Sequence, residues 1–243
     1  MFWILAVDTS APGGAVALVA NDAVVVERAG DPAVSHGERL PAAIDAVLAD
    51  AGLTAAALDL MAVAAGPGAF TGLRVGLATI QGLALALDRP AVGVGCLPAL
   101  AWRHFEVDAH ADACGVWLDG ARGDVFAAAF RRADATASTW PPVEIAAPVV
   151  VPPEVALAGW REVLAGGAPL VLGPGAARHA AAAGDRPATV ADQPLAGTVG
   201  RIGGRLHAAG AAGPPHALIP IYVRRPDAEV ERDRRRAAGA STR

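Results

Sequence analysis

The chain has 243 residues, of which 53% are hydrophobic and 5% aromatic, so its core must be built mainly from Ala, Val and Leu. Its formal net charge is −4, and all 20 of its basic residues are Arg. This balance excludes a global basic field able to hold nucleic acid unaided, and the Arg-rich end 224–243 is the local exception.

The chain is predicted to open with strands. Residues 2–8 are rich in β-forming side chains, 9–14 carry Ser, Pro and Gly turn signals, and 15–20 and 23–28 continue as strands. No positively charged segment precedes the first apolar run, which ends at Asp8. We therefore expect a strand there and not a signal peptide.

A helix, a strand and a second helix follow. Ser35-His36-Gly37-Glu38 has the form of a capping box, and apolar residues recur behind it at helical spacing, with Pro41 predicted to kink the helix. Residues 58–65 read as a buried strand, 71–87 as a helix and 91–94 as a strand. The first hundred residues thus indicate an α/β layer architecture.

The second half begins as the first does. A strand at 115–118 ends in Asp119 and a Gly-containing turn, and a second strand returns over 125–131, so Asp8 and Asp119 occupy matching places. This match suggests two related halves. Later elements are a strand, glycine turn and helix over 169–183, a helix at 195–209 and an extended segment at 217–223. The polar end 224–243 is expected to be disordered.

The protein is expected to be cytoplasmic, with no membrane association. The apolar stretch 75–87 is too short to span a bilayer and is interrupted by Gln81. Cys96 and Cys114 fit neither a disulfide framework nor a zinc spacing and are interpreted as core residues.

The strongest local signal is Gly66-Pro67-Gly68-Ala69-Phe70-Thr71-Gly72-Leu73-Arg74-Val75-Gly76. Its glycines allow a sharp turn, and the following helix start could bind an anion, so both a structural turn and an anion site stay open. A Walker loop is excluded because the chain has no Lys, and the spacing departs from the dinucleotide fingerprint. Arg74 opposes the helix dipole and therefore needs a ligand or a partner.

These residues also carry a resemblance. The string above resembles the signature of the TsaB (YeaZ) family, and it occurs with I-L-A-V-D-T-S at 4–10, S-H-G-E-R-L-P at 35–41, D-G-A-R-G-D-V-F at 119–126 and P-I-Y-V-R-R at 220–225. These blocks follow the family's order, whereas about 132–168 match weakly. The resemblance implies an actin-like, sugar-kinase-type (ASKHA) fold of two related lobes, here 1–100 and 101–223, with a last strand returning to the first lobe.

The resemblance further implies a non-catalytic scaffold subunit for threonylcarbamoyladenosine modification of tRNA. Such a subunit pairs with the catalytic paralogue TsaD, or with a second copy of itself when TsaD is absent. The ATPase TsaE joins this pair, and tRNA is contacted through the complex. The subunit itself requires no cofactor, although the resemblance allows for ATP or ADP with magnesium in the complex. The implied nucleotide-proximal or phosphate-proximal residues are Asp8, Thr9, Ser10, Gly66, Gly68, Thr71, Arg74, Asp119 and Arg122.

Two helices are predicted to form the partner interface. The second is apolar all round and carries small residues on one face, so it needs cover on more than one side. The predicted interface residues are Leu40, Ile44, Val47, Gly72, Val75, Gly76, Thr79 and Leu83.

No pair of His residues or Ser–His pair in the sequence has a spacing that indicates a catalytic or metal site. His104 and His110 are six residues apart and would face opposite sides of a helix, so we predict no metal site. Ser35 is interpreted as a cap and not as a nucleophile beside His36. A standalone ATP-dependent kinase or hydrolase of the actin-like fold is the alternative function, favoured by Asp8 and Asp119, and a metallopeptidase is a weaker third.

Overall fold

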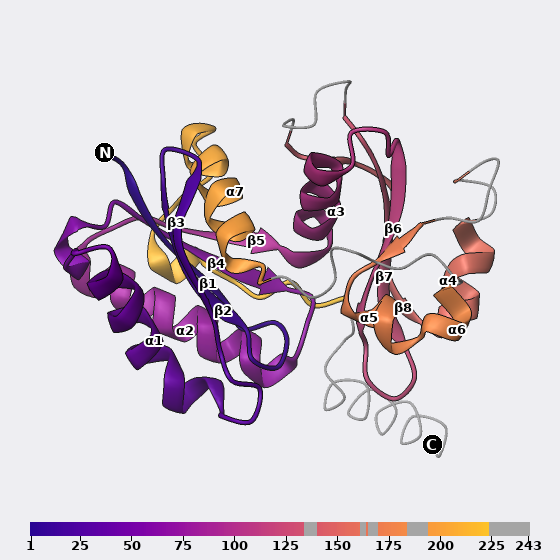
Figure 1. Ribbon diagram of the computed structural model, residues 1–243, viewed down its shortest axis with the longest axis horizontal. Coiled ribbons are helices and arrows are strands. Elements are labelled where there is room, and N and C mark those ends of the chain that lie inside the picture. The colour runs from indigo at the N-terminus through magenta and orange to yellow at the C-terminus, as the bar shows by residue number, and fades with distance from the viewer. Residues whose placement is uncertain (134–139, 161–163, 165–169, 184–193, 224–243) are drawn as a thin grey trace, which may run out of the picture.

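The protein forms two lobes, each built on a β-sheet (Figure 1). The computed structural model describes residues 1–133, 140–160, 164, 170–183 and 194–223. From the N-terminus the elements are β1 (Trp3–Asp8), β2 (Ala15–Ala20), β3 (Ala23–Ala29), α1 (His36–Asp50), η1 (Ala55–Ala57), β4 (Leu60–Gly66), α2 (Phe70–Leu87), β5 (Ala91–Gly95) and α3 (Cys96–Val107). They continue with β6 (Ala113–Asp119), β7 (Val125–Arg131), β8 (Val143–Val151), α4 (Pro153–Trp160), β9 (Val171–Leu172), α5 (Pro174–Arg178), α6 (Ala180–Ala183), α7 (Ala196–Ala208) and η2 (Pro215–Ala217).

The sheet of the first lobe has the strand order β3-β2-β1-β4-β5. β1 is antiparallel to β2 and parallel to β4, which in turn is parallel to β5. Side chains alternate between two cores: Ile4 and Ala6 pack with residues of α7 and α3, whereas Leu5 and Val7 pack with those of α1 and α2. Because both faces are covered, the central strands β1 and β4 are apolar except for Asp8 at the end of β1, as buried parallel strands usually are.

The second lobe repeats this arrangement. Its sheet has the order β8-β7-β6-β9, with β6 antiparallel to β7 and parallel to β9. A Gly-Pro-Gly turn follows β4 at 66–68, and another follows β9 at 173–175. The two related halves suggested by the sequence are therefore seen in strand order, strand direction and turn position.

Two helices, α3 and α7, do not follow the predicted division into lobes at residues 100 and 101. α3 contacts β4, β5 and α7 of the first lobe and also β6 and β7 of the second, and Figure 1 shows it between the two sheets. α7 falls within 101–223, the range predicted for the second lobe, yet it packs on the sheet of the first. Gly200 of this helix lies against Val19 and Ala6, where a larger residue would hold the helix away from the sheet.

Several local predictions differ from the structure. The resemblance implied a last strand returning to the first lobe, but η2 occupies 215–217 and the segment from 218 to 223, predicted to be extended, forms no strand. It is held to the first sheet by the N–H of Ile221, which donates to the carbonyl of Ala65 at 2.7 Å. Helices α3 and α4 and strand β8 were not predicted from the sequence. The predicted disordered end, 224–243, lies outside the described residues.

Among the described residues, α2 is the one helix long and apolar enough to cross a membrane by length and composition. It begins at Phe70, five residues before the apolar run considered in the sequence, which explains the difference from the prediction. Here α2 packs against β4 and α1, and only 33% of its residues are buried. The other residues of α2 are half-buried or exposed, and half-buried Val75, Leu83 and Leu87 still pack against the core.

Candidate functional site

The candidate site begins at the carboxyl end of β1, where Asp8, Thr9 and Ser10 are all buried. The N–H of Ser10 donates to the carboxylate of Asp8 at 2.8 Å, the local turn that a short acidic side chain favours. Asp8 is 6% exposed, so little of its carboxylate is open to a solvent-borne ligand.

The Gly-Pro-Gly turn closes over this strand end. The N–H of Ala69 donates to the carbonyl of Ser10 at 2.7 Å, and a Cβ on Gly68 would lie 2.5 Å from the same oxygen. Gly66 has φ +115°, which only glycine adopts readily. Gly68 and the N–H of Ala69 thus contact the loop that follows β1 (residues 9–14, the β1 loop), while Gly66 lies against Ile221. These contacts favour the structural interpretation over anion binding.

The first turns of α2 pack closely against Thr9. An added Cβ on Gly72 would overlap the carbonyl oxygen of Thr9, and one on Gly76 would overlap its hydroxyl. The Thr9 hydroxyl is buried and has no hydrogen-bond partner among the described residues. Close packing, and not a ligand, explains the small residues at these positions of α2.

Two groups beside Asp8 have perturbed pKa values. Burial, and then the charge of Asp8, raises the pKa of the Cys96 thiol to about 12, so this thiol stays protonated near neutral pH. Burial lowers the pKa of His36, Arg39 lowers it further, and Asp8 opposes the shift. The site thus holds a neutral thiol and favours a neutral imidazole.

Ser35 and His36 do not form a dyad. The hydroxyl of Ser35 donates to the carboxylate of Glu38 at 2.7 Å, while Nδ1 of His36 is 2.6 Å from Nη2 of Arg39. Ser35 is the N-cap residue, but its side chain makes no hydrogen bond to the helix backbone. The predicted capping box is therefore wrong in detail: the two side chains that should cap the backbone bind each other.

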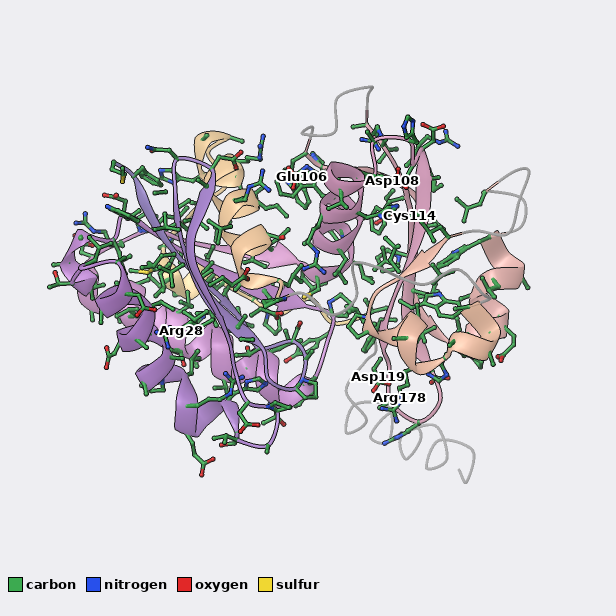
Figure 2. The ribbon with its side chains drawn as sticks, in the orientation of Figure 1. Arg28, Glu106, Asp108, Cys114, Asp119 and Arg178 are labelled. Atoms are coloured by element: carbon green, nitrogen blue, oxygen red, sulfur yellow. The ribbon has the colours of Figure 1, made fainter. Side chains whose placement is uncertain are left out.

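The matching turn of the second lobe is more open. The carboxylate of Asp119 accepts from the N–H of Ala121 at 3.0 Å, as Asp8 does from Ser10, and forms an ion pair with Arg178 at 3.3 Å. Figure 2 shows Asp119 and Arg178 together at this end of the second lobe. Arg122 sits in the same turn with φ +57° and is exposed. The two aspartates share a local conformation and differ in burial.

No group of three or more His, Cys, Asp or Glu side chains that could hold a metal occurs in the described part of the chain. His104 is buried in α3, and both of its ring nitrogens lack a partner among those residues. His110 lies in the exposed turn after α3.

The predicted partner interface is largely buried inside the chain itself. Leu40, Ile44 and Val47 of α1 face the sheet, and Gly72 and Gly76 of α2 face the β1 loop. For these five residues the prediction of an exposed face is wrong, because the helical period shows which residues share a side but not where that side points. The remaining three are half-buried: Val75, Thr79 and Leu83.

Arg74 finds its partner on a segment far away in sequence. Its Nε donates to the hydroxyl of Tyr222 at 3.1 Å, and its guanidinium carbon lies 3.8 Å from the centre of the Phe70 ring. The Phe70 and Tyr222 rings stack with centres 5.5 Å apart. Arg74 was predicted to need a ligand or a partner, but this cluster was not predicted. The one signal was that P-I-Y-V-R-R contains the chain's single Tyr.

A second missed feature lies at the start of α7. The carboxylate of Glu27, in β3, accepts from the N–H of Gly197 at 2.7 Å and so satisfies one of the free N–H groups of the helix. Burial raises the pKa of Glu27, although this hydrogen bond and Arg103 act in the opposite direction. The contact joins residues 170 positions apart, beyond the reach of local sequence patterns.

Comparison with known proteins gives consistent results. A family described as TsaD: tRNA N6-adenosine threonylcarbamoyltransferase matches residues 31–150. An uncharacterized protein of Mycobacterium tuberculosis is 34% identical over 228 residues, which cover 93% of each chain. The tRNA threonylcarbamoyladenosine biosynthesis protein TsaB of Bacillus subtilis is 31% identical over 66% of this chain and 65% of its own length. The solved structure of YeaZ from Pseudomonas aeruginosa superposes with a TM-score of 0.74 at 26% identity and covers 91% of this chain and 100% of that one.

Proposed function

Because the chain belongs to the TsaB (YeaZ) family and has a role in the biosynthesis of threonylcarbamoyladenosine in tRNA, we propose that it serves there as a non-catalytic subunit that pairs with a TsaD-type transferase. The observation that carries this proposal is α2, an apolar helix of 18 residues of which only 33% are buried. A large apolar patch exposed on a protein surface usually marks a site that another protein covers.

The residues of the candidate site support a non-catalytic subunit. The Asp8 carboxylate accepts the Ser10 N–H, the Ser35 hydroxyl is bound to Glu38, and the Cys96 thiol is buried with a raised pKa. A nucleophile needs an adjacent base or a lowered pKa, and these groups have the opposite environment. The side chains at the end of β1 thus lie in the turn that joins β1 to β2, and this turn packs against the start of α2.

The proposed partner face consists of exposed and half-buried residues on one side of α2: Val75, Thr79, Gly82, Leu83 and Ala86. All but Thr79 are apolar, and the Thr79 hydroxyl donates to the carbonyl of Val75 at 2.8 Å, so it presents no free donor. Nothing lies within 4 Å of a Cβ built on Gly82, which leaves room for a closely packed helix.

We expect the neighbouring helix α1 to extend this face. On α1, Ala42, Asp45 and Ala49 are exposed at a spacing that puts them on one side. A TsaD-type partner is favoured because the family matched by residues 31–150 is the transferase, so that partner presents a related pair of helices. In the absence of the transferase we expect a second copy of this chain to cover the face. TsaE and tRNA then bind to the complex of this chain with the transferase.

A standalone ATP-dependent kinase or hydrolase remains the second candidate. The matching turns at Asp8 and Asp119 favour it, since each carboxylate ends a strand in the same conformation. The packing of Gly68, Gly72 and Gly76 on Ser10 and Thr9 argues against it, because the β1 loop fills the space in front of α2 where a phosphate would bind.

Reconstitution separates the two candidates. The purified chain is assayed alone for ATP turnover and for transfer of threonylcarbamoyl to tRNA, and again with a TsaD-type transferase, TsaE and the adenylate donor. We expect no transfer by the chain alone and loss of transfer when the chain is omitted from the full mixture. Transfer or steady ATP turnover by the chain alone would contradict the proposal.

A further inference from the structure

The side chains of Phe70, Arg74 and Tyr222 form a cluster of mutual contacts on the surface. Phe70 is 43% exposed and Tyr222 is 38% exposed, and Arg74 contacts both through a cation–π contact and a hydrogen bond. Such contacts fix two rings and a guanidinium in one arrangement before any ligand arrives, which lowers the entropy lost on binding.

A groove of about 360 Å³ lies beside this cluster, between α2 and the segment 218–222. It is lined by Tyr222, Arg74 and Gln81 and by the apolar residues Leu77, Ala78, Leu218 and Pro220. Gln81 adds an amide: its Nε2 donates to the carbonyl of Leu218 at 3.0 Å, while its oxygen accepts no hydrogen bond from the described residues. The groove therefore offers an aromatic ring, apolar walls, one cation and one free acceptor.

These groups fit a flat ring with polar edges. A nucleobase stacks on an aromatic side chain or on a guanidinium, and an amide can hydrogen-bond its edge. Arg74 also supplies positive charge for a neighbouring phosphate. The sequence continues directly with Arg224 and Arg225, and residues 224–243 contain seven Arg and four acidic residues in a chain whose net charge is −4.

We infer that the groove beside Tyr222 binds an unpaired base of an RNA, so that this subunit contacts the tRNA substrate itself. The inference rests on the proposed function, which brings tRNA to the complex. The groove and the partner face lie on different sides of α2, since Arg74 and Gln81 point away from Val75, Thr79 and Leu83 by the helical period. RNA and the transferase can therefore be bound together.

The test uses a fluorescent RNA hairpin with a single-stranded loop, and the same strand annealed to its complement, which has no unpaired bases. Binding is measured by anisotropy to the full chain, free and mixed with the transferase. Tyr222→Ala and Gln81→Leu should weaken hairpin binding, on the order of tenfold for Tyr222→Ala because one stacking contact is lost. Tyr222→Phe keeps the ring and should retain most of the affinity. Binding of the annealed duplex should be little changed by any of these variants.

Ile219→Ala is the matched control, because Ile219 is 73% exposed on the same segment and does not line the groove. Hairpin binding that is unchanged in both Tyr222→Ala and Gln81→Leu would overturn the inference, and so would equal losses with Ile219→Ala. Normal RNA binding with a weakened heterodimer would show that the groove contacts protein, and this too would overturn it. Failure of wild-type pairing with the transferase would instead contradict the proposed function.

Discussion

Gly76 of α2 lies directly against the side chain of Thr9 at the end of β1, with no room between them for a Cβ atom. The contact joins the loop that follows the first strand to the helix that carries the proposed partner face. The fully buried Thr9 thus fixes how α2 lies on the sheet, and through it which side of the helix is left exposed.

Gly76→Ala should lower the free energy of unfolding by about 1–3 kcal/mol, because the added methyl group overfills a packed contact. Gly82→Ala is the matched control in the same helix, since a Cβ there meets nothing within 4 Å. It should raise the free energy of unfolding by up to about 1 kcal/mol through helix propensity alone. Urea denaturation of both variants measures the difference, and equal effects would contradict the packing at Thr9.

Glu27→Gln should change how stability depends on pH. Burial raises the pKa of Glu27 above its ordinary value of 4.5, so the folded state binds the proton more tightly than the unfolded state. The stability contributed by this group is complete below 4.5 and is lost as the pH rises through the folded-state pKa. Gln keeps an oxygen for the N–H of Gly197 but cannot ionise. The wild type should therefore lose stability relative to Glu27→Gln as the pH rises from below 4.5 to neutral, and parallel curves would contradict this.

His104→Leu should reduce the sensitivity of the fold to acid. Burial lowers the pKa of His104 below its ordinary value of 6.5, with Arg132 acting in the same direction and Asp108 opposing. For a base with a lowered pKa, the stability it contributes is present above 6.5 and is lost as the pH falls through the folded-state value. The wild type should lose stability faster than His104→Leu below pH 6.5. His110→Leu, in an exposed turn, is the control and should follow the wild type.

Local patterns predicted much of the fold. Continuous apolar runs indicated β1, β2 and β4, and the matching turns at Asp8 and Asp119 indicated two related halves, which the strand pairing confirms. The actin-like (ASKHA) fold implied by the resemblance is also confirmed. β8 and α4 escaped prediction because β8 is a partly exposed edge strand without clear alternation and α4 has eight residues.

The site was harder to predict for a physical reason. Gly72, Gly76 and Leu83 share a side of α2, and the sequence alone could not show that the loop after β1 already occupies two of these positions. Likewise, Arg74 meets Tyr222 across 148 residues, a contact that depends on the path of the chain after α7. Side chains whose partners are distant in sequence carry no local periodicity.

Pairing through α2 is tested most directly by sedimentation velocity of the chain mixed with a TsaD-type transferase. Gly82→Arg places a charged side chain on the exposed partner face without touching the core, and Arg favours a helix more than Gly does, so the variant should melt at or slightly above the wild-type temperature. The wild type and Gly82→Ala should sediment with the transferase as a heterodimer, whereas Gly82→Arg should bind on the order of a hundredfold more weakly, because it buries an unpaired charge. A heterodimer of unchanged affinity with Gly82→Arg, or no heterodimer with the wild type, would contradict the assignment.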